Sequence, residues 1–339
     1  MGSPSFDLAG QKVLVAGGAG FVGSQLVREL VGLGARVVVY DNFLHGTRHN
    51  LSELNGRIEV VIGDVLDEYK LFETFRRCSP RFAFNLVGDT YVPSAYDVPK
   101  RFLRVNVEGT MNVLLAAKSA GVERSVYVSS TEVYGEARTV PMTEEHALAP
   151  ANTYAVTKLA ADRICFTFHH EHRIPVRIAR IYNSYGPRET QPYVIPEIVT
   201  QLAKGPTVEL GNLDARRDFT FVSDTAKGLI ATLLCDLPDG EVVNIGSNQT
   251  HSVRDLVEKI APLLGHERYE IKTDPRRLRR FDIECFQCDS SKLRALSGWK
   301  PEVGIDEGLK RTVSWFLENG REWSWERWVD GTIVYDGVV

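Results

Sequence analysis

The stretch VLVAGGAGFVGSQLV, residues 13–27, decides the fold of this chain. It begins as an apolar β-branched run, passes through Gly17, Gly20 and Gly23 at G-x-x-G-x-x-G spacing, and continues as an amphipathic helical pattern. In such a strand–turn–helix the first glycine permits the tight turn, the second lets a pyrophosphate approach the backbone, and the third allows close helix packing. The helix N-terminus then faces the phosphates. The stretch therefore predicts a dinucleotide-binding strand and helix.

Similar apolar runs continue along the chain, separated by amphipathic stretches such as 24–34 and 105–121. The runs are KVLVA (12–16), RVVVY (36–40), EVVIG (59–63), FAFNLV (82–87), SVYVSS (125–130) and VRIARI (176–181). They are almost continuously apolar, as expected for strands that are covered on both faces. Strands that alternate with helices imply right-handed crossovers. The chain is therefore predicted to be an α/β protein with a doubly wound parallel sheet of the Rossmann type.

The pattern changes near residue 181, where proline and glycine become frequent and the predicted strands come singly. These strands are TVEL (207–210), EVVNIG (241–246) and YEIK (269–272). We therefore expect a discontinuous dinucleotide-binding domain formed by 10–180 and 218–246. A smaller mixed lobe for the substrate would comprise 181–217 and 247–320. The tail, 321–339, carries three of the five tryptophans and has no assigned role.

Composition excludes several classes of protein. Of the 339 residues, 43% are hydrophobic and 25% are charged, which is ordinary globular usage. A net charge of −4 argues against a general nucleic-acid or anionic-membrane binder. No apolar run approaches the roughly 20 residues that cross a bilayer, and the start, MGSPSFDLAG, has no signal-peptide pattern. Five cysteines do not form a disulfide framework, so we expect a cytoplasmic protein without membrane or nucleic-acid partners.

Two acidic residues follow the second and third predicted strands. Asp41 lies eighteen residues past Gly23, where a carboxylate can accept both ribose hydroxyl hydrogens and repel a 2′-phosphate. This position favours NAD over NADP, although a turn aspartate without a ligand would give the same pattern. Asp64 ends the third strand and is a candidate for the adenine edge.

Tyr154 and Lys158, in NTYAVTKLAAD, are four residues apart and project from one face of a predicted helix. A phenol normally titrates near pH ~10. An adjacent ammonium and an oxidised nicotinamide would favour its phenolate and make it a base near neutrality. Upstream, in SVYVSSTEVYGE, a predicted strand ends in the hydroxyls of 129–131 followed by Glu132. Side chains at the carboxyl end of a parallel strand lie in the ligand crevice.

Together these motifs identify a family. The residues concerned are GGAGFVG (17–23), Asp41, Asp64, Val65, Asn106, SSTEVYG (129–135), Tyr154, Lys158, Asn183 in RIYNSYGPR, RRDFTFVSD (216–224) and the arginines within 276–280. In this order they resemble the extended short-chain dehydrogenases/reductases of the nucleotide-sugar epimerase/dehydratase family. The resemblance covers residues 11 to about 317.

The resemblance implies a tightly held NAD, no metal, and a nucleotide-diphosphate sugar (UDP, GDP or dTDP) as substrate. Tyr154 would be the base at the C4 hydroxyl, Lys158 would bind the nicotinamide ribose, and Ser130 would bind the sugar O4. The implied NAD-binding residues are Gly17, Gly20, Phe21, Val22, Gly23, Asp41, Asn42, Asp64, Val65, Leu86, Thr90, Asn106, Tyr154 and Lys158. The implied substrate-binding residues are Pro93, Ser130, Tyr154, Asn183, Arg188, Val208, Arg217 and Arg279. A homodimer through a four-helix bundle, formed by helices around 100–119 and 154–171, is also implied.

Glu132 separates branches of this family. Oxidation at C4 makes the C5 hydrogen acidic, and a carboxylate is the natural base to remove it. The pair Thr131-Glu132 resembles the GDP-mannose and UDP-N-acetylglucosamine dehydratases and departs from the Asp-Glu pair of the glucose dehydratases. We therefore predict a 4,6-dehydratase in which Ser130, Thr131, Glu132, Tyr154 and Lys158 form the catalytic set.

Other outcomes stay open at this point. The same hydroxyl–Glu pair occurs in UDP-glucuronate decarboxylases, and Arg188 could face a sugar carboxylate. A C4 epimerase would use the same oxidation, and a non-catalytic dinucleotide-binding sensor is a more remote possibility. Glu132 itself could simply point into solvent from the end of its strand. The sequence names neither the nucleobase nor the sugar.

Two further motifs are interpreted as structural, and a third is interpreted as part of the substrate site. Cys285 and Cys288 form a C-x-x-C without a second pair, and His169 and His172 lack a third ligand, so neither motif predicts a metal site. The basic run DPRRLRRFD (274–282) fits a diphosphate pocket better than nucleic acid.

Overall fold

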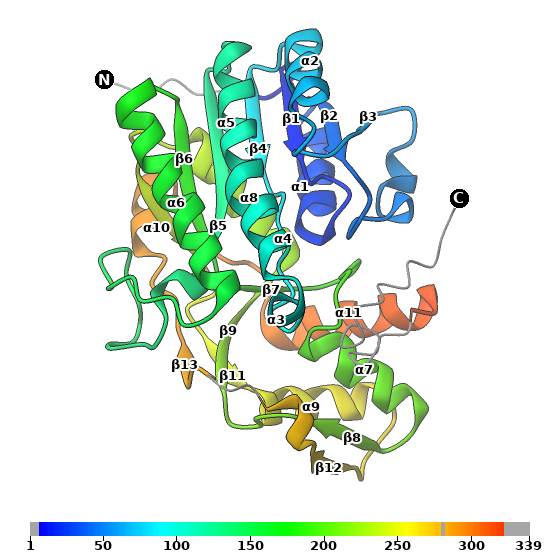
Figure 1. The fold of residues 1–339 in the computed structure, drawn as a ribbon. Helices are drawn as coiled ribbons and strands as arrows, with labels where there is room; N and C mark the ends of the chain where they lie inside the picture. Colours follow the sequence, from blue (N-terminus) through cyan, green and yellow to red (C-terminus); the bar gives the residue numbers. More distant parts are fainter. Residues whose placement is uncertain (1–6, 279–281, 322–339) are drawn as a thin grey trace.

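A computed structural model describes residues 7–278 and 282–321 (Figure 1). Its centre is a sheet of seven parallel strands in the order β10-β6-β5-β4-β1-β2-β3. The strands are β1 (Lys12–Ala16), β2 (Arg36–Asp41), β3 (Glu59–Ile62), β4 (Phe82–Asn85), β5 (Arg124–Ser130), β6 (Val176–Ile181) and β10 (Val242–Ile245). This is the 3-2-1-4-5-6 order of dinucleotide-binding sheets with β10 added beside β6. The predicted doubly wound parallel sheet is confirmed.

Helices cover both faces of this sheet, which explains why its strands are continuously apolar. Helices α1 (Phe21–Gly32) and α8 (Val222–Leu234) pack on one face, where they enclose Phe82 and Phe84 of β4. On the opposite face α2 (Glu68–Cys78) and α5 (Gly109–Ser119) pack over Ala83, and α6 (Thr153–His172) packs beside α5 over β5 and β6 (Figure 1). Successive residues of one strand point to opposite faces, so every position of β4 is buried.

Three features of this half differ from the sequence prediction. Strand β3 lies at the sheet edge, and two of its four residues, Val60 and Ile62, are exposed apolar side chains. Helix α1 begins at Phe21, inside the glycine stretch and three residues earlier than expected. The helix expected over 105–121 begins with a π-helical turn, Arg104–Glu108, before α5. Such turns occur often at functional sites.

Shorter helical segments connect these elements. They are η1 (Arg48–Leu54), α3 (Ser94–Asp97), α4 (Pro99–Leu103), η2 (Arg104–Glu108), η3 (Thr131–Tyr134), η4 (Pro275–Arg277) and α10 (Ser291–Ser297). The segment η3 follows β5 directly and carries Glu132. No helix within the described residues is both long enough and apolar enough to cross a membrane.

The lobe has its own hydrophobic core beneath the carboxyl ends of the sheet (Figure 1). Its elements are β7 (Asn183–Tyr185), α7 (Val194–Lys204), β8 (Thr207–Leu210), β9 (Arg216–Phe221), β11 (Thr250–Ser252), α9 (Val253–Leu263), β12 (Glu270–Thr273), β13 (Cys285–Phe286) and α11 (Ile305–Asn319). Strand β9 pairs in parallel with β7 and β13 and antiparallel with β11, and β8 pairs in parallel with β12. The predicted smaller lobe of mixed structure is therefore confirmed.

Candidate active site

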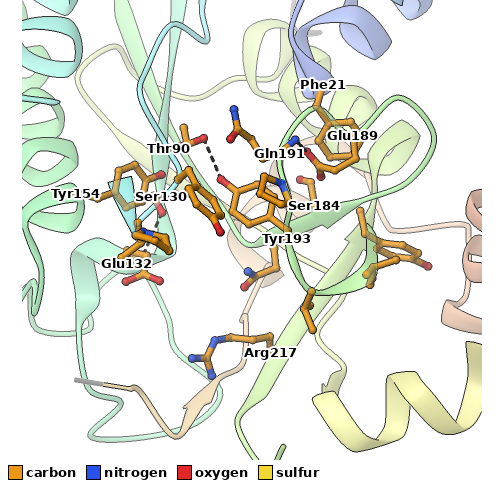
Figure 2. Close-up of a pocket in the computed structure, with 18 of the residues that line it drawn as sticks. Phe21, Thr90, Ser130, Glu132, Tyr154, Ser184, Glu189, Gln191, Tyr193 and Arg217 are labelled. Atoms are coloured by element: carbon orange, nitrogen blue, oxygen red, sulfur yellow. Dashed lines mark hydrogen bonds between the residues drawn. The ribbon is translucent and has the colours of Figure 1, made fainter. Parts of the chain in front are cut away.

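A cavity of about 1320 Å³ lies where the carboxyl ends of the parallel strands meet the lobe (Figure 2). Ligands of doubly wound sheets bind at this edge, near the point where the strand order reverses; here that point is between β1 and β4. The cavity brings together most of the predicted site. Its lining includes Gly17, Gly20, Phe21, Val22, Gly23, Leu86, Thr90, Pro93, Ser130, Thr131, Glu132, Tyr154, Lys158, Asn183 and Arg217. The remaining described candidates, Asp41, Asn42, Asp64, Val65, Asn106, Arg188 and Val208, do not line it.

The glycine loop between β1 and α1 has the geometry of a phosphate cradle. Gly17 has a φ of +81°, and a Cβ atom there would lie 3.0 Å from the backbone of Leu86. A Cβ on Gly23 would lie 2.0 Å from the Gly17 carbonyl oxygen, so only glycine fits at either position. Helix α1 begins immediately after the loop, with its first N–H groups available to an anion. These residues fit a dinucleotide pyrophosphate.

Asp41, at the end of β2, holds this loop in place by hydrogen bonds. Its carboxylate accepts hydrogen bonds from the backbone N–H groups of Ala19 and Phe43, both at 2.8 Å. Burial raises the pKa of Asp41, whereas these two hydrogen bonds lower it. Each carboxylate oxygen can accept a further bond, so the side chain can still receive ribose hydroxyls. Asp41 lies behind the loop, however, and is only 7% exposed.

Asn42, Asp64 and Val65 form a second group at the ends of β2 and β3, outside the cavity. The Asn42 amide donates to Asp64 at 2.9 Å, and Asp64 also accepts from the backbone N–H of Leu66. Val65 is buried, and a Cβ on Gly109 would lie 2.6 Å from its Cγ2. Their place next to the loop is compatible with the adenine end of a dinucleotide.

Asn106 lies in the π-helical turn and is completely buried behind the cavity wall. Its Oδ1 accepts from the backbone N–H of Asp89 at 2.8 Å, and its Nδ2 donates to the Asp89 carbonyl and to Thr157 Oγ1. The side chain therefore joins the loop after β4 to helix α6. In this structure its amide supports the wall rather than facing the cavity.

Ser130 and Glu132 follow one another at the end of β5. Ser130 caps η3, with its Oγ accepting from the backbone N–H of Glu132 at 3.2 Å. The Glu132 carboxylate receives a hydrogen bond from Asn152 Nδ2 at 3.0 Å. Glu132 is partly buried and lines the cavity with Tyr154 and Ser130 (Figure 2). The interpretation of a glutamate that points away into solvent is therefore wrong.

Tyr154 lies in the first turn of α6 and is 8% exposed. Burial raises the pKa of Tyr154 above the ordinary phenol value, and a hydrogen bond with Ser130 partly offsets this effect. The negative charge of Glu132 raises the pKa further. The Tyr154 hydroxyl is therefore protonated near neutrality. Its conversion to a phenolate requires additional positive charge nearby.

Lys158 lies one helical turn after Tyr154, as predicted, but its ammonium group binds elsewhere. Its Nζ donates to the carbonyl of Val128 at 2.6 Å and lies 4.6 Å from the ring centroid of Tyr127. Burial lowers the pKa of Lys158 to about 8. One of the three ammonium donors is used at the β5 backbone, and the predicted support of the Tyr154 phenolate by this charge stays a prediction.

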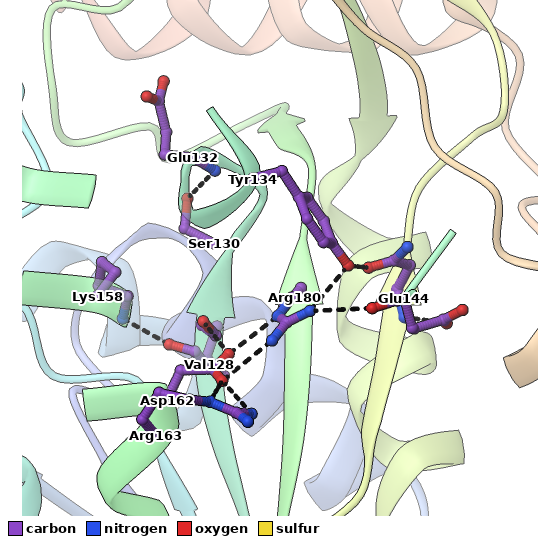
Figure 3. A network of polar contacts seen from close by, with 11 residues as sticks. Val128, Ser130, Glu132, Tyr134, Glu144, Lys158, Asp162, Arg163 and Arg180 are labelled. Atoms are coloured by element: carbon purple, nitrogen blue, oxygen red, sulfur yellow. Dashed lines mark hydrogen bonds and ion pairs between the residues drawn. The ribbon is translucent and has the colours of Figure 1, made fainter. Parts of the chain in front are cut away.

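A buried polar network holds β5, α6 and β6 in register beneath these groups (Figure 3). Arg180 makes two hydrogen bonds to the carboxylate of Asp162, at 2.9 and 3.1 Å, and Ser129 donates to the same carboxylate. Although burial alone would raise the pKa of Asp162, Arg180 and Arg163 hold it below its usual value. The network fixes the middle of α6, at Asp162, against the end of β5 and against β6.

The predicted substrate residues divide into two groups. Asn183 and Arg217 line the cavity, and Arg217 is held by Asp282 at 3.0 Å and by the carbonyl of Ile283 at 2.7 Å. Arg188 has a φ of +70° and directs its guanidinium to Glu53 of η1, away from the cavity. Val208 is buried in the lobe core. Arg279 lies outside the described residues.

The family model described as GDP-mannose 4,6-dehydratase matches residues 14–312. The chain belongs to this family.

Individual relatives in this family are named for different reactions. The dTDP-glucose 4,6-dehydratase of Xanthomonas campestris pv. campestris (strain B100) is 31% identical over 350 residues, which cover 96% of each chain. UDP-glucuronic acid decarboxylase 1 of Xenopus tropicalis is 30% identical over 321 residues, covering 90% of this chain and 72% of that one. The crystal structure of DesIV, a dTDP-glucose 4,6-dehydratase from Streptomyces venezuelae, was determined with NAD bound. It has a TM-score of 0.84 and 31% identity, and the match covers 91% of this chain and 98% of that one.

These similarities confirm the predicted family and the prediction that the chain is an enzyme. The predicted cofactor, NAD, is the one bound in the DesIV structure. The relatives include both dehydratases and a decarboxylase at about 31% identity. These similarities therefore establish the family and not the specific reaction.

Sequence reasoning missed a group of buried polar residues that the lobe contributes to the cavity. Glu189, Gln191 and Tyr193 follow β7 and line it, and burial raises the pKa of Glu189 to about 8 (Figure 2). Tyr193 Oη donates to Thr90 Oγ1 at 2.9 Å, and the Gln191 amide contacts His45 at 3.1 Å. The only signal for them was the proline-rich composition of 187–196, which indicates a loop, and loops near a rigid sheet often carry function.

The C-x-x-C motif and the histidine motif have surroundings that a structural role explains. Cys285 is partly exposed on β13 and Cys288 is buried, and both are free thiols. His169, near the end of α6, contacts the carbonyl of Ile174 at 3.0 Å. Within the described part of the chain, no group of three or more His, Cys, Asp or Glu side chains is arranged to hold a metal ion.

Proposed function

We propose that this enzyme is an NAD-dependent nucleotide-sugar 4,6-dehydratase. The observation that supports this proposal most strongly is the Glu132 carboxylate, which shares one cavity with Ser130 and Tyr154 at the carboxyl end of β5. NAD, when bound, would supply the oxidation at C4 and return the same two electrons to C6. The residues of the chain would bind the sugar, orient it and move the protons.

Each proton has an acceptor at the cavity. Tyr154 would accept the O4 proton, with Ser130 holding the same oxygen through its hydroxyl. The C4 ketone makes the C5 hydrogen acidic, and Glu132 would remove it. Thr131 cannot act as an acid near neutrality. We therefore propose that Glu132 gives the proton taken from C5 to the C6 hydroxyl, which leaves as water. A C5–C6 double bond then remains beside the C4 ketone. Return of the hydride to C6, together with a solvent proton delivered to C5 through Glu132, would give the 4-keto-6-deoxy sugar, and Tyr154 would release the O4 proton to solvent to complete the balance.

We propose that NAD lies along the glycine loop, with the pyrophosphate at the start of α1 and the adenosine toward Asp41 and Asp64. The diphosphate of the sugar substrate would be held by Arg217. We also propose a division of the chain into a discontinuous dinucleotide domain, expected over 10–180 and 218–246, and a lobe, expected over 181–217 and 247–320. We move the boundary at 217 to the end of β9, because Phe219 and Phe221 pack in the lobe core. We further propose a cytoplasmic location.

A UDP-glucuronate decarboxylase is the second candidate, since one relative carries that activity and the loss of carbon dioxide from a β-keto acid needs no acid at C6. Arg188 was the residue expected to face the sugar carboxylate. Because it pairs with Glu53 outside the cavity, that argument for decarboxylation is removed. A C4 epimerase remains the third candidate, and it would need no carboxylate at position 132.

A panel of nucleotide sugars tests these three reactions together. The purified enzyme is incubated with GDP-mannose, dTDP-glucose, UDP-N-acetylglucosamine, UDP-glucuronate and UDP-glucose. We expect a 4-keto product, detected by its near-ultraviolet absorbance in alkali, from one of the first three. Carbon dioxide release from UDP-glucuronate would replace the dehydratase with the decarboxylase, and inversion at C4 without a keto product would replace it with an epimerase.

We further propose a homodimer in which α5 and α6 pair with their copies. Their outer surface carries exposed apolar side chains: Leu115 is 37% exposed, Val156 51% and Phe166 39%. The two helices lie side by side (Figure 1), and exposed apolar side chains on neighbouring elements favour an interface there. Light scattering should show a dimer at micromolar concentration, and Val156→Glu should shift the protein toward monomer. A wild-type monomer under these conditions contradicts the bundle.

A further inference from the structure

Asn152 occupies the position immediately before α6 and uses both ends of its side-chain amide. Its Oδ1 accepts a hydrogen bond from the backbone N–H of Ala155 at 2.8 Å and so caps the helix that carries Tyr154. Its Nδ2 donates to Glu132 Oε2 at 3.0 Å. One small side chain therefore joins the start of α6 to the carboxylate at the end of β5.

The orientation of this amide follows from its two partners. A helix N-terminus presents N–H donors, so the capping atom must be the oxygen. The NH₂ group is then directed at the carboxylate, which accepts only. The reversed amide would place two donors against each other at Ala155 and two acceptors against each other at Glu132. The link can therefore form in one orientation only.

The bond also distinguishes the two oxygens of Glu132. Among the described residues, Asn152 donates the only side-chain hydrogen bond that this carboxylate receives, and it is made to Oε2. The backbone N–H of Glu132 is held separately by Ser130. A glutamate side chain that is partly exposed would otherwise sample several rotamers. Asn152 leaves Oε1 to accept a proton.

We infer that Asn152 is a positioning residue for Glu132, which it holds in register with Tyr154 so that the two proton acceptors address adjacent carbons of one sugar. The inference rests on the proposed function, since it assumes that Glu132 acts at C5. Asn152 does not line the cavity, and in this inference it acts by fixing a carboxylate that does. Asn152 thereby links the Glu132 carboxylate directly to the first turn of the helix that carries Tyr154.

The matched variants are Asn152→Ser and Asn152→Ala. Serine is also a good N-cap, so Asn152→Ser keeps the helix cap and loses only the donor to Glu132. Asn152→Ala loses both. We expect equal thermal stability for wild type and Asn152→Ser, and lower stability for Asn152→Ala. A purely structural role would make Asn152→Ser equivalent to wild type in every assay.

The functional measurement separates the two steps of the reaction, using the sugar of the panel that the wild type converts. Asn152→Ser should still oxidise C4, so reduced nicotinamide accumulates on adding the sugar. Exchange of solvent deuterium into C5 should slow on the order of 10- to 100-fold, which is the usual effect of a small misplacement of a catalytic group. KM should change little. In the Glu132→Gln background, Asn152→Ser should cause no additional loss.

The outcomes distinguish this inference from the function on which it rests. If Glu132→Gln abolishes deuterium exchange while Asn152→Ser exchanges at the wild-type rate, the positioning role of Asn152 is overturned and the proposed function stands. If Glu132→Gln exchanges normally, or if the wild type converts no sugar of the panel to a keto product, both fail. Crystal structures of wild type and Asn152→Ser provide a readout without turnover, because an unmoved Glu132 carboxylate in the variant would also overturn the inference.

Discussion

The sheet wall and the lobe wall of the cavity hold their polar side chains by different means. On the sheet wall, Ser130 and Glu132 follow β5 directly and Tyr154 begins α6, so regular elements determine where each group lies. On the lobe wall, Arg217 and Arg277 line the cavity but are already paired with carboxylates, Asp282 and Glu197, at 3.0 Å each.

This difference suggests a division of labour. Proton transfer tolerates little error in distance, so its groups belong on rigid elements with a second layer of support; here Asp162 and Arg180 supply that support. Binding a charged group tolerates more, and an arginine has five N–H donors to share between a protein carboxylate and a ligand. Substitutions on the sheet wall should therefore affect turnover, and those on the lobe wall should affect affinity.

The largest effect is expected from the loss of a tyrosine hydroxyl on the sheet wall, and the matching substitution on the lobe wall is its control. Tyr154→Phe should reduce turnover on the order of 10²–10⁴-fold, the usual loss for a positioned acid–base group. The bound NAD should stay oxidised when the sugar is added, because O4 keeps its proton. Tyr193→Phe is the control on the lobe wall: it removes a hydroxyl that bonds Thr90 and should cost less than about tenfold. Equal losses in the two variants would remove the proposed division.

The next prediction compares two buried groups whose pKa values are both about 8, Glu189 on the lobe wall and Lys158 on the sheet wall. Folded Glu189 keeps a proton that the unfolded chain releases above a pKa of 4.5, so stability falls as pH rises from 4.5 to about 8. Folded Lys158 loses a proton that the unfolded chain keeps up to 10.5, so stability rises from about pH 8 to 10.5.

Glu189→Gln should therefore be more stable than wild type at pH ~8 and close to it at pH ~5, by a difference on the order of a few kcal/mol. Denaturant unfolding at the two pH values measures this difference. Lys158→Met is the counterpart, whose stability relative to wild type should fall only above about pH 8. A Glu189→Gln variant with the same pH slope as wild type would show that Glu189 is ionised in the folded protein.

The same contrast between the walls explains how much could be predicted from the sequence. The six strands from 12–16 to 176–181 were located to within about two residues, because each is an almost continuous apolar run, the pattern of strands buried on both faces. Tyr154, Lys158, Ser130 and Glu132 were predicted together, since residues that follow a strand or lie four apart on a helix have positions fixed by local geometry.

The rest depends on contacts between distant segments, which no local pattern encodes. Arg188 was expected to face the substrate, yet it pairs with Glu53, which is 135 residues away in the sequence. Glu189 lies in a loop that the sequence marks only by its prolines, and no local pattern shows that this loop packs against the cavity. Val60 and Ile62 of β3 are apolar but exposed, since edge position is a property of the whole sheet.

A smaller effect, confined to binding, is expected from the lobe arginine. Arg217→Ala should raise KM roughly 10- to 100-fold, as expected for the loss of charged hydrogen bonds to a diphosphate, with little change in kcat. Arg217→Lys should recover only part of this loss, because an ammonium keeps the charge but lacks the planar pair of donors. Arg188→Ala is the control, since Arg188 pairs with Glu53 outside the cavity and should leave KM unchanged. A fall in kcat for Arg217→Ala with an unchanged KM would assign Arg217 to the chemical step.

The smallest effect concerns the cofactor end of the sheet wall. Asp41 binds the backbone N–H groups of Ala19 and Phe43, and we expect its charge to repel the 2′-phosphate of NADP as well. Asp41→Ala should shift the ratio of NADP to NAD affinity roughly tenfold toward NADP, equivalent to ~1.4 kcal/mol. Because the substitution also releases the glycine loop, NAD affinity and thermal stability should both fall, and Asp41→Asn serves as the control that keeps the size of the side chain without its charge. A loss of affinity for both cofactors in equal proportion would mean that Asp41 acts only on the loop, and the basis for NAD preference would then lie elsewhere on this wall.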